Sequence, residues 1–464
     1  MGLEQKKHLF VFLSCLVVVF SFKLDVLHLG YFWDEMDAYV GPAIALSEGS
    51  LWNVLPGFHP AEMFYGHPPF LFLLLASAFK LFGQSPFVAH IVTVFFAALG
   101  VFGTYRLTYH LAGFREGVLA ALLLFFSPIY FAQSAICTAD IFVATLSVWV
   151  VYYYLKNKLF AAATAGVILA MTKLTALGIF ASILLYECIL ALRTSRIDFK
   201  RFATLLLPLA VSLIFLTLQW ATTGRLVPND YFNSRNFFSD FNISQILSNS
   251  SSILRFIFFD QARFITSIFL LFLVFRKSLR TATPILIFSI IILFYTISFS
   301  TMFFLIRYIT LLFPFYFAII SILICTEIQT KYLANALALA ISATFLFLGI
   351  NYSKNDGRID ATMQYADFVR VHQQAARYME DNYNDIILLS DPPFSNAVRN
   401  TNNGYVLHHT QTVTTNILEA NTAAFFTKPN KQTYPLTILQ ENGFTQVNIF
   451  TVGHHYFIIL RKVN

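Results

Sequence analysis

Residues 305–325 read LIRYITLLFPFYFAIISILIC, with Arg307 as the one charged residue in the run. About 20 predominantly apolar residues are needed to cross a bilayer as a helix, so this run is long enough. Ten further apolar runs are spread along the chain, at 8–29, 86–106, 117–136, 141–155, 159–172, 174–192, 202–222, 263–275, 281–300 and 331–350. The sequence therefore predicts an all-α polytopic membrane domain with about eleven transmembrane helices.

The composition supports this prediction and excludes other classes of protein. Hydrophobic residues make up 57% of the 464 residues and charged residues only 12%, against about 25% charged in soluble domains. The net charge of +7 comes from basic residues in short loops, without the basic stripe that nucleic-acid binding needs. The four cysteines form no CxxC pair, which argues against a disulfide framework or a zinc site.

Lysine and arginine fall in alternate loops between the apolar runs. On one side stand Lys6, Lys7, Arg106, Arg115, Lys156, Lys158, Arg193, Arg196, Lys200, Arg201, Arg276, Lys277, Arg280 and Lys331. The opposite loops hold acids, among them Asp34, Asp37, Asp140, Asp230 and Asp240. Positive loops stay in the cytoplasm. We therefore expect a multi-pass protein of the cell inner membrane with a cytoplasmic N-terminus.

The run 68–82 is an exception to the alternation. It begins with Pro68-Pro69 and is about fifteen residues long, which is short for a span and suits an interfacial helix. If it crossed the membrane, every later basic loop would lie outside. We therefore place it on the outer membrane surface.

The composition changes near Asn351, where the apolar runs end. Apolar residues at helical spacing predict a helix over Tyr365–Tyr383, and Ile386–Leu389, Val447–Phe450 and Phe457–Leu460 have the pattern of strands. We therefore expect two domains: a membrane domain over 1–350, and a small extracytoplasmic α/β domain over 351–464.

Two of the segments at the predicted outer face carry acids. Asp34 and Glu35 directly follow the first apolar run, and Asp140 opens a later one. An acid at the edge of the hydrocarbon is costly unless it faces a polar partner or cavity. A carboxylate there could deprotonate an acceptor, or hold a cation beside a diphosphate or phosphate. The structural alternatives are a solvated loop acid for Asp34 and a helix cap for Asp140.

The same face carries cations and a histidine from three other segments. His67 precedes a rigid Pro-Pro pair, Lys173 stands outside against the positive-inside bias, and Arg307-Tyr308 begins a span. Arginine suits bidentate recognition of phosphate. A structural histidine and pairing with lipid headgroups are the alternatives. Together the five segments indicate a site for a phosphate-linked substrate with a base nearby.

These residues occur in an order that resembles a known group. An acidic pair after the first span is followed by Gly66-His67-Pro68-Pro69, Thr138-Ala139-Asp140, Thr172-Lys173, and Arg307-Tyr308 with Pro314 downstream. The order is similar to that of the GT-C membrane glycosyltransferases, in the branch of the protein O-mannosyltransferases and the lipid A aminoarabinose transferases. The similarity spans roughly residues 10–325.

The resemblance implies an inverting transfer of a sugar from a polyprenyl-phosphate donor to an extracytoplasmic lipid, glycan or protein acceptor. It assigns catalytic roles to Asp34, its neighbour Glu35 and Asp140. It assigns substrate binding to His67, Lys173, Arg307 and Tyr308, with Lys173 and Arg307 in contact with the donor phosphate. Some members of the group are linked to a divalent cation, so metal use is left open. The chain departs from the group at Lys173-Leu174, where relatives often have Lys-Gly.

Other classes of function compete with a transferase. A transporter or flippase of lipid-linked substrates would need charged groups near mid-span or an inverted repeat, and the acids here stand at span ends. A membrane scaffold would leave the converging charges unexplained. An oligosaccharyltransferase that moves a preassembled glycan is a further alternative among enzymes.

Overall fold

The computed structural model describes residues 2–59, 63–64, 67–226, 243–270, 283–301, 305–328, 330–352, 359–383, 385–408, 410–427 and 436–462. The predicted basic residues Arg276, Lys277 and Arg280 lie outside these ranges, as do Asp230, Asp240, Gly66 and the end of the run 263–275. All the candidate site residues lie within them.

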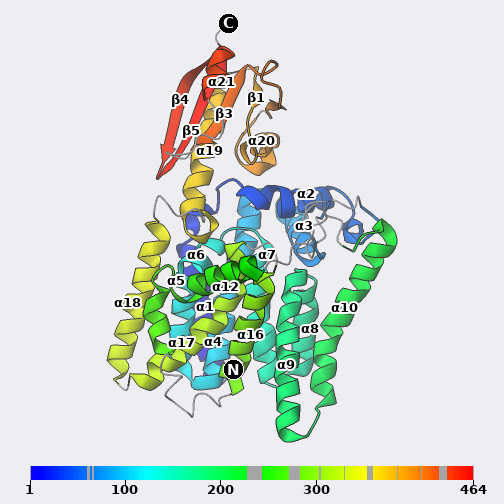
Figure 1. Cartoon of the computed structure of the whole chain (residues 1–464), viewed down its shortest axis with the longest axis vertical. Helices are drawn as coiled ribbons and strands as arrows, with labels where there is room; N and C mark the ends of the chain where they lie inside the picture. The colour runs from blue at the N-terminus through cyan, green and yellow to red at the C-terminus, as the bar shows by residue number, and fades with distance from the viewer. Residues whose placement is uncertain are drawn as a thin grey trace.

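Helices form the larger part of the chain, and most of the long ones run roughly parallel to one another, whereas α12 lies across them (Figure 1). They are α1 (Leu3–Ser21), α4 (Pro86–Ala112), α5 (Phe114–Phe126), α6 (Pro128–Gln133), α7 (Ala139–Leu155), α8 (Leu159–Ala170), α9 (Leu177–Thr194), α10 (Phe199–Thr223), α12 (Ile243–Phe258), α13 (Arg263–Ser267), α16 (Thr283–Ser300), α17 (Phe313–Glu327) and α18 (Lys331–Ile350). In the described ranges, short helical turns connect the longer elements at Leu24–Val26 (η1), Glu35–Val40 (η2, a π-helix), Leu51–Val54 (η3), Leu174–Ala176 (η4), Ile268–Leu270 (η5), Ile306–Leu312 (η6), Ile359–Ala361 (η7) and Thr401–Asn403 (η8).

Five helical segments of the described chain are long and apolar enough to cross a membrane: Pro86–Ala112, Leu174–Thr194, Phe199–Thr223, Ile306–Glu327 and Lys331–Ile350. Four shorter apolar helices accompany them, at Phe70–Phe82, Ala139–Leu155, Leu159–Ala170 and Leu286–Ser300. In Ile306–Glu327, 83% of the apolar window is buried inside the protein, against 22% in Phe199–Thr223. The run that opens with Arg307 is therefore central, and α10 is peripheral.

The prediction for 68–82 can be compared with α3 (Phe70–Phe82), which has 13 residues. At about 1.5 Å per residue it is too short to cross a bilayer of about 30 Å. It lies beside α2 (Gly41–Glu48) at the end of the helices that faces the C-terminal sheet (Figure 1). This position agrees with an interfacial helix.

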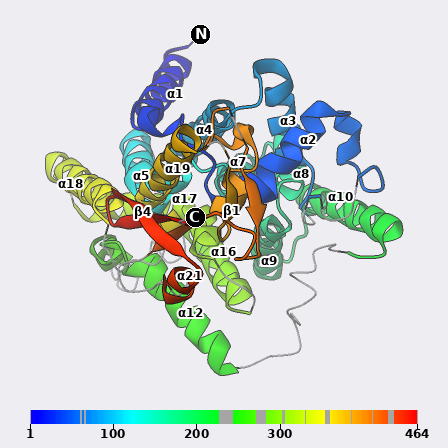
Figure 2. The same ribbon diagram turned by 90° about the horizontal axis from the view of Figure 1, so that it is seen from above.

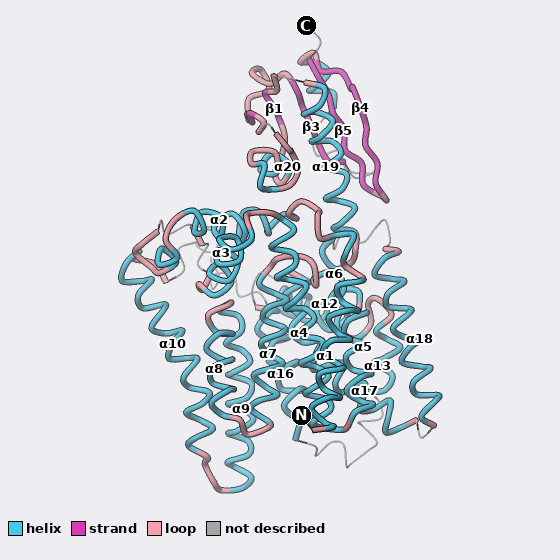
Figure 3. Tube along the Cα trace, turned by 180° about the vertical axis from the view of Figure 1, so that it is seen from behind, coloured by secondary structure: helices cyan, strands magenta, loops and turns pink. Residues whose placement is uncertain are grey.

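Strands occur only beyond α18 in the described chain, and they form one five-stranded sheet (Figure 3). The order is β2-β1-β3-β5-β4, with β1 parallel to β2 and β3, and β5 antiparallel to β3 and β4. The strands are β1 (Ile387–Leu389), β2 (Thr412–Thr414), β3 (Thr422–Thr427), β4 (Phe444–Val452) and β5 (His455–Lys462), and the helices of this part are α19 (Gln364–Asn382), α20 (Phe394–Ala397) and α21 (Leu436–Glu441). The predicted fold class is confirmed: a helical membrane part followed by a small α/β part.

The sheet sits over the middle of the helices (Figure 2) and is joined to the segment after α1. The Tyr31 amide donates to the Asn403 carbonyl at 3.1 Å, and the Tyr405 hydroxyl donates to the Tyr31 carbonyl at 2.9 Å. A Cβ atom at Gly30 would lie 2.6 Å from the Tyr405 ring, so only glycine fits this approach without a shift. The contact fixes the chain four residues before Asp34.

Candidate active site

Arg307 is the centre of a charged cluster at the sheet-facing end of the helices. It lies in η6, at the start of the central helical run, and its side chain is 8% exposed. Its Nη2 bonds to Asp34, its Nε lies 3.1 Å from the Asp140 carboxylate, and its Nη1 lies 3.1 Å from that of Asp360. Three carboxylates from distant segments therefore share one buried guanidinium.

Lys173 joins the cluster through Asp140. The Lys173 ammonium donates to Asp140 at 2.7 Å and lies 4.0 Å from the centre of the Tyr308 ring. Both charged side chains are less than a tenth exposed. Asp140 is thus held by two cations rather than serving as the cap of α7, because Thr138 is the N-cap residue there. Tyr308, predicted to bind substrate, covers the lysine with its ring as a cation–π partner.

A backbone contact brings His67 to the same place. The Phe70 amide, at the start of α3, donates to the Met171 carbonyl at 2.9 Å, which ties the Pro-Pro turn to the segment before Lys173. The His67 ring stacks on Tyr39 with 5.3 Å between ring centres. Burial, aided by the nearby Lys173 ammonium, lowers the pKa of His67 to about 4. A neutral imidazole at this position can donate or accept a hydrogen bond to a sugar hydroxyl.

Glu35 is the predicted catalytic residue that the structure does not bring into the cluster. Its carboxylate accepts from the Phe32 amide at 2.5 Å, from the Cys137 amide, and lies 3.2 Å from His90. The side chain is 1% exposed. These contacts give Glu35 a structural role: it ties the loop after α1 to α4 and to the segment before α7. His90, which had no special sequence context, is its partner.

Asp360 is a member of the cluster that sequence reasoning missed. It lies in η7 between α18 and α19, and its backbone carbonyl accepts from the Gln133 side chain at 2.8 Å. Burial raises the pKa of Asp360, although the Arg307 guanidinium lowers it in part. The sequence feature that could have identified Asp360 is an acidic residue shortly after the last apolar run, on the predicted outer side of the membrane.

Exposure separates the three carboxylates around Arg307. The side chain of Asp34 is 35% exposed, that of Asp360 16% and that of Asp140 5%. Asp34 is therefore the one that a molecule entering from solvent meets first. Asp140, enclosed between Arg307 and Lys173, can hold those cations in place but has little room to reach a substrate.

The described donor atoms do not make a metal site. Within the ranges that the structure describes, no group of three or more His, Cys, Asp or Glu side chains could hold a metal ion. The three carboxylates of the cluster are instead arranged around Arg307.

Comparison with known proteins gives the same type of architecture. The family model described as dolichyl-phosphate-mannose-protein mannosyltransferase matches residues 66–220. ArnT from Cupriavidus metallidurans in the apo state superposes with a TM-score of 0.58 at 12% identity, over 98% of this chain and 98% of ArnT. This is the GT-C fold. The resemblance predicted from the order of the motifs is confirmed at this level.

Two further solved structures share the fold. ArnT bound to undecaprenyl phosphate gives a TM-score of 0.56 at 13% identity, over 97% of each chain. The Archaeoglobus fulgidus oligosaccharyltransferase in complex with zinc and sulfate gives 0.50 at 13% identity, over 89% of this chain and 67% of that one. No curated protein matches the sequence significantly. At these identities the likeness establishes the fold, and the function must be argued from the cluster.

Proposed function

We propose that this chain is a membrane glycosyltransferase that moves a sugar from a polyprenyl-phosphate carrier to an extracytoplasmic acceptor. The observation that carries the proposal is the buried pair of cations, Arg307 and Lys173, interlocked with Asp34 and Asp140 at one end of the helices. Buried cations are costly unless anions meet them. Here the protein supplies carboxylates in the place where a substrate phosphate can bind.

The donor phosphate is proposed to bind at Arg307 and Lys173. A guanidinium offers two parallel donors to phosphate oxygens, and an ammonium adds a point charge. When phosphate takes the Arg307 donors, Asp34 is released from its ion pair. ArnT, which shares the fold, has been solved with undecaprenyl phosphate bound, and this supports a lipid phosphate as the ligand.

Asp34 then serves as the base in the proposed reaction. An acceptor hydroxyl or amine attacks the anomeric carbon, its proton passes to the Asp34 carboxylate, and the bond from that carbon to the phosphate oxygen breaks. The electron pair of the broken bond stays on the phosphate, where Arg307 and Lys173 stabilise the added charge. A single displacement of this kind inverts the anomeric configuration. His67 and Tyr308 are proposed to line the sugar.

The outer face of the cytoplasmic membrane is the proposed location of the site and of the C-terminal domain. The distribution of lysine and arginine supports it. A cysteine introduced at the exposed Leu418, in a background without the native cysteines, should react with an impermeant maleimide in whole cells. Labelling only after the membrane is opened would show that the C-terminal domain lies in the cytoplasm.

The transfer is tested with purified protein in nanodiscs and a panel of polyprenyl-phosphate sugars. The expected result is release of free polyprenyl phosphate from one donor, dependent on an acceptor such as lipid A, a glycan or a protein. A flippase would instead move the intact donor across sealed vesicles without breaking it. Translocation without cleavage, for every donor tried, would overturn the proposal.

A further inference from the structure

The end of the helices opposite the charged cluster has a hollow of its own. The hairpin of α9 and α10 extends furthest from the C-terminal sheet (Figure 1), and the hollow lies at its tip. It has a volume of about 860 Å³. Its lining comprises Asn157, Glu187, Leu190, Thr194, Arg196, Ile197, Asp198, Phe199, Lys200 and Arg201. Nothing in the proposed transfer uses this site.

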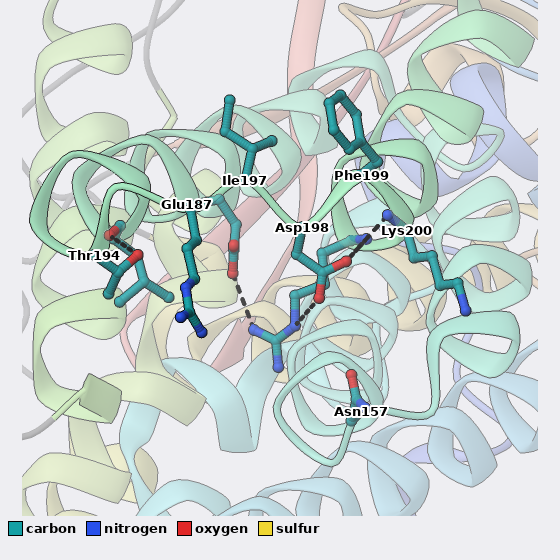
Figure 4. Close-up of a pocket in the computed structure, with 10 residues that line it drawn as sticks. Asn157, Glu187, Thr194, Ile197, Asp198, Phe199 and Lys200 are labelled. Atoms are coloured by element: carbon teal, nitrogen blue, oxygen red, sulfur yellow. Dashed lines mark hydrogen bonds and ion pairs between the residues drawn. The ribbon is translucent and has the colours of Figure 1, made fainter.

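Both carboxylates of the hollow are already bound within the protein (Figure 4). Glu187, 3% exposed, accepts from the Tyr154 hydroxyl and from Arg201 at 3.0 Å. Asp198 caps α10 by accepting from the Lys200 and Arg201 amides at 3.1 and 3.2 Å. Arg201 also lies 3.8 Å from Asp198 through Nε. Arg201 therefore offsets only one of the two acidic charges, and with Arg196 and Lys200 the lining holds three cations against two carboxylates, a net charge of +1.

Arg196 and Lys200 are exposed, and neither pairs with a carboxylate of the described chain. The Lys200 side chain extends away from the Asp198 carboxylate (Figure 4). A surplus of cations at the membrane boundary favours an anion, and a guanidinium favours phosphate over a simple carboxylate. More positive charge stands close by on the α7–α8 turn, at Lys156 and Lys158.

Apolar side chains share the hollow with these cations. Ile197 is 58% exposed and Phe199 78% exposed, and Leu190 lines the same surface. Large apolar groups at the end of a peripheral hairpin lose contact with water when acyl chains cover them. Cations beside apolar side chains match a molecule with a charged headgroup and hydrocarbon tails. A free phosphate would contact only the cations and leave the apolar side chains uncovered.

We propose that this hollow binds the phosphate headgroup of an anionic phospholipid in the adjacent leaflet, with its acyl chains along α9 and α10. Basic pockets between helices on the cytoplasmic side are the usual sites for such headgroups. The inference rests on the hairpin and its charges, and it stands whether or not the chain transfers a sugar.

The test compares lipid retention by native mass spectrometry after detergent exchange, with cardiolipin and phosphatidylcholine as probes. The double variant Arg196→Ala/Lys200→Ala should bind cardiolipin on the order of ten- to thirtyfold more weakly, because two headgroup cations are lost. Lys7→Ala/Lys331→Ala is the matched control, since both lysines are exposed on the same predicted face. It should retain cardiolipin within about twofold.

Further measurements keep the proposal open to contradiction. Phe199→Ser should weaken cardiolipin binding and leave the binding of inorganic phosphate unchanged. If cardiolipin binding fell equally in the hollow variant and the control variant, the effect would be one of overall charge, and the proposed site would be wrong. Competition by inorganic phosphate as strong as by cardiolipin would overturn the lipid as its occupant. Thermal unfolding of each variant checks that the hairpin is still folded.

Discussion

Two arginines, one toward each end of the helical part, each hold more than one carboxylate. Arg201 pairs with Glu187 and Asp198, which lie on the same hairpin of α9 and α10. Arg307 pairs with Asp34, Asp140 and Asp360, which are 273, 167 and 53 residues away along the chain by their numbers. The first arrangement closes a local hairpin, and the second gathers distant segments.

The difference shows which ion pairs indicate a site. At Arg201 the side chain is 23% exposed, and the hollow around it holds three cations against two carboxylates. At Arg307 it is 8% exposed, and three carboxylates face only two cations when Lys173 is counted. Burial of an unbalanced set costs free energy, and such an arrangement suits a site that exchanges one of its own anions for a ligand.

The largest expected effect comes from removing the proposed base. Asp34→Asn is nearly isosteric but cannot take a proton, so transfer should fall by roughly 10²–10⁴-fold with the donor still bound. Turnover on the purified variant measures it. Two control variants make the same change elsewhere: Asp198→Asn at the opposite end of the helices, and Asp37→Asn in the same loop as Asp34. Turnover in both should stay within about twofold of wild type. Wild-type turnover in Asp34→Asn would remove Asp34 as the base.

The two arginines themselves should differ in stability. Arg307→Ala leaves three carboxylates without their buried partner, which should cost about 3–5 kcal/mol and abolish donor binding. Arg201→Ala should cost less, about 1–3 kcal/mol, because Arg201 is 23% exposed and the Tyr154 hydroxyl still donates to the buried Glu187. Unfolding in mixed micelles measures both. Arg307→Lys should recover only part of the donor affinity because lysine lacks the planar fork; full recovery would argue against bidentate contact with phosphate.

Glu35 provides a comparison with Asp34 within the sheet-facing end of the helices. Glu35→Gln places an amide where two backbone N–H groups need an acceptor, so stability should fall by about 1–3 kcal/mol. The turnover number of the protein that remains folded should change little. Glu48→Gln, at an exposed acid of the same segment, is the control for stability. A drop in turnover like that of Asp34→Asn would return Glu35 to the catalytic groups.

The smallest effect is expected at Asp360. Because its pKa is raised, its charged form is disfavoured in the folded protein, and its contribution to stability is lost as the pH rises through that pKa. Asp360→Asn should therefore not lower the unfolding midpoint at pH 7. It should bind polyprenyl phosphate about three- to tenfold more tightly, since one competing anion is gone.

The dependence of donor affinity on pH provides a second measure of Asp360. In the wild type, affinity for polyprenyl phosphate should increase as the pH falls through the raised pKa, because protonation removes a negative charge beside Arg307. In Asp360→Asn this rise should flatten. Weaker phosphate binding by the variant at pH 7 would mean that Asp360 orients Arg307 for the donor instead of competing with it.

Depth in the membrane explains how far the site could be predicted from sequence. Asp34, Asp140, Lys173 and Arg307 each stand at the end of an apolar run, and a membrane fixes the height of such residues. Parity of the loops then puts them on one face. No single apolar run reveals the order of the helices around the bundle. The order of the motifs indicated that these four residues also meet laterally, and the structure shows their contacts.

Glu35 and Asp360 show where this reasoning ends. Glu35 shares its depth with Asp34, but in the turn into η2 the two adjacent side chains point to different neighbours, and only packing decides which one faces the site. Asp360 stands in a polar segment with no periodic pattern. Five of the eleven expected spans are long and apolar enough to cross a membrane in the described chain. They and the strands at Val447–Phe450 and Phe457–Leu460 could be predicted because their patterns are local. β3 was missed because its sequence, Thr-Ala-Ala-Phe-Phe-Thr, lacks the alternation of a half-buried strand.

The close approach at Gly30 has a consequence for where the working unit of this protein ends. The apolar runs stop at residue 350, and a shortened chain cut there would look complete by hydropathy. It would nevertheless lose Asp360 from the cluster, and Tyr405 and Asn403 from the backbone that leads into Asp34. The shortest chain able to form this site is therefore expected to extend through the strands. The residues after 350 are then a structural part of the site and not a separate, dispensable domain.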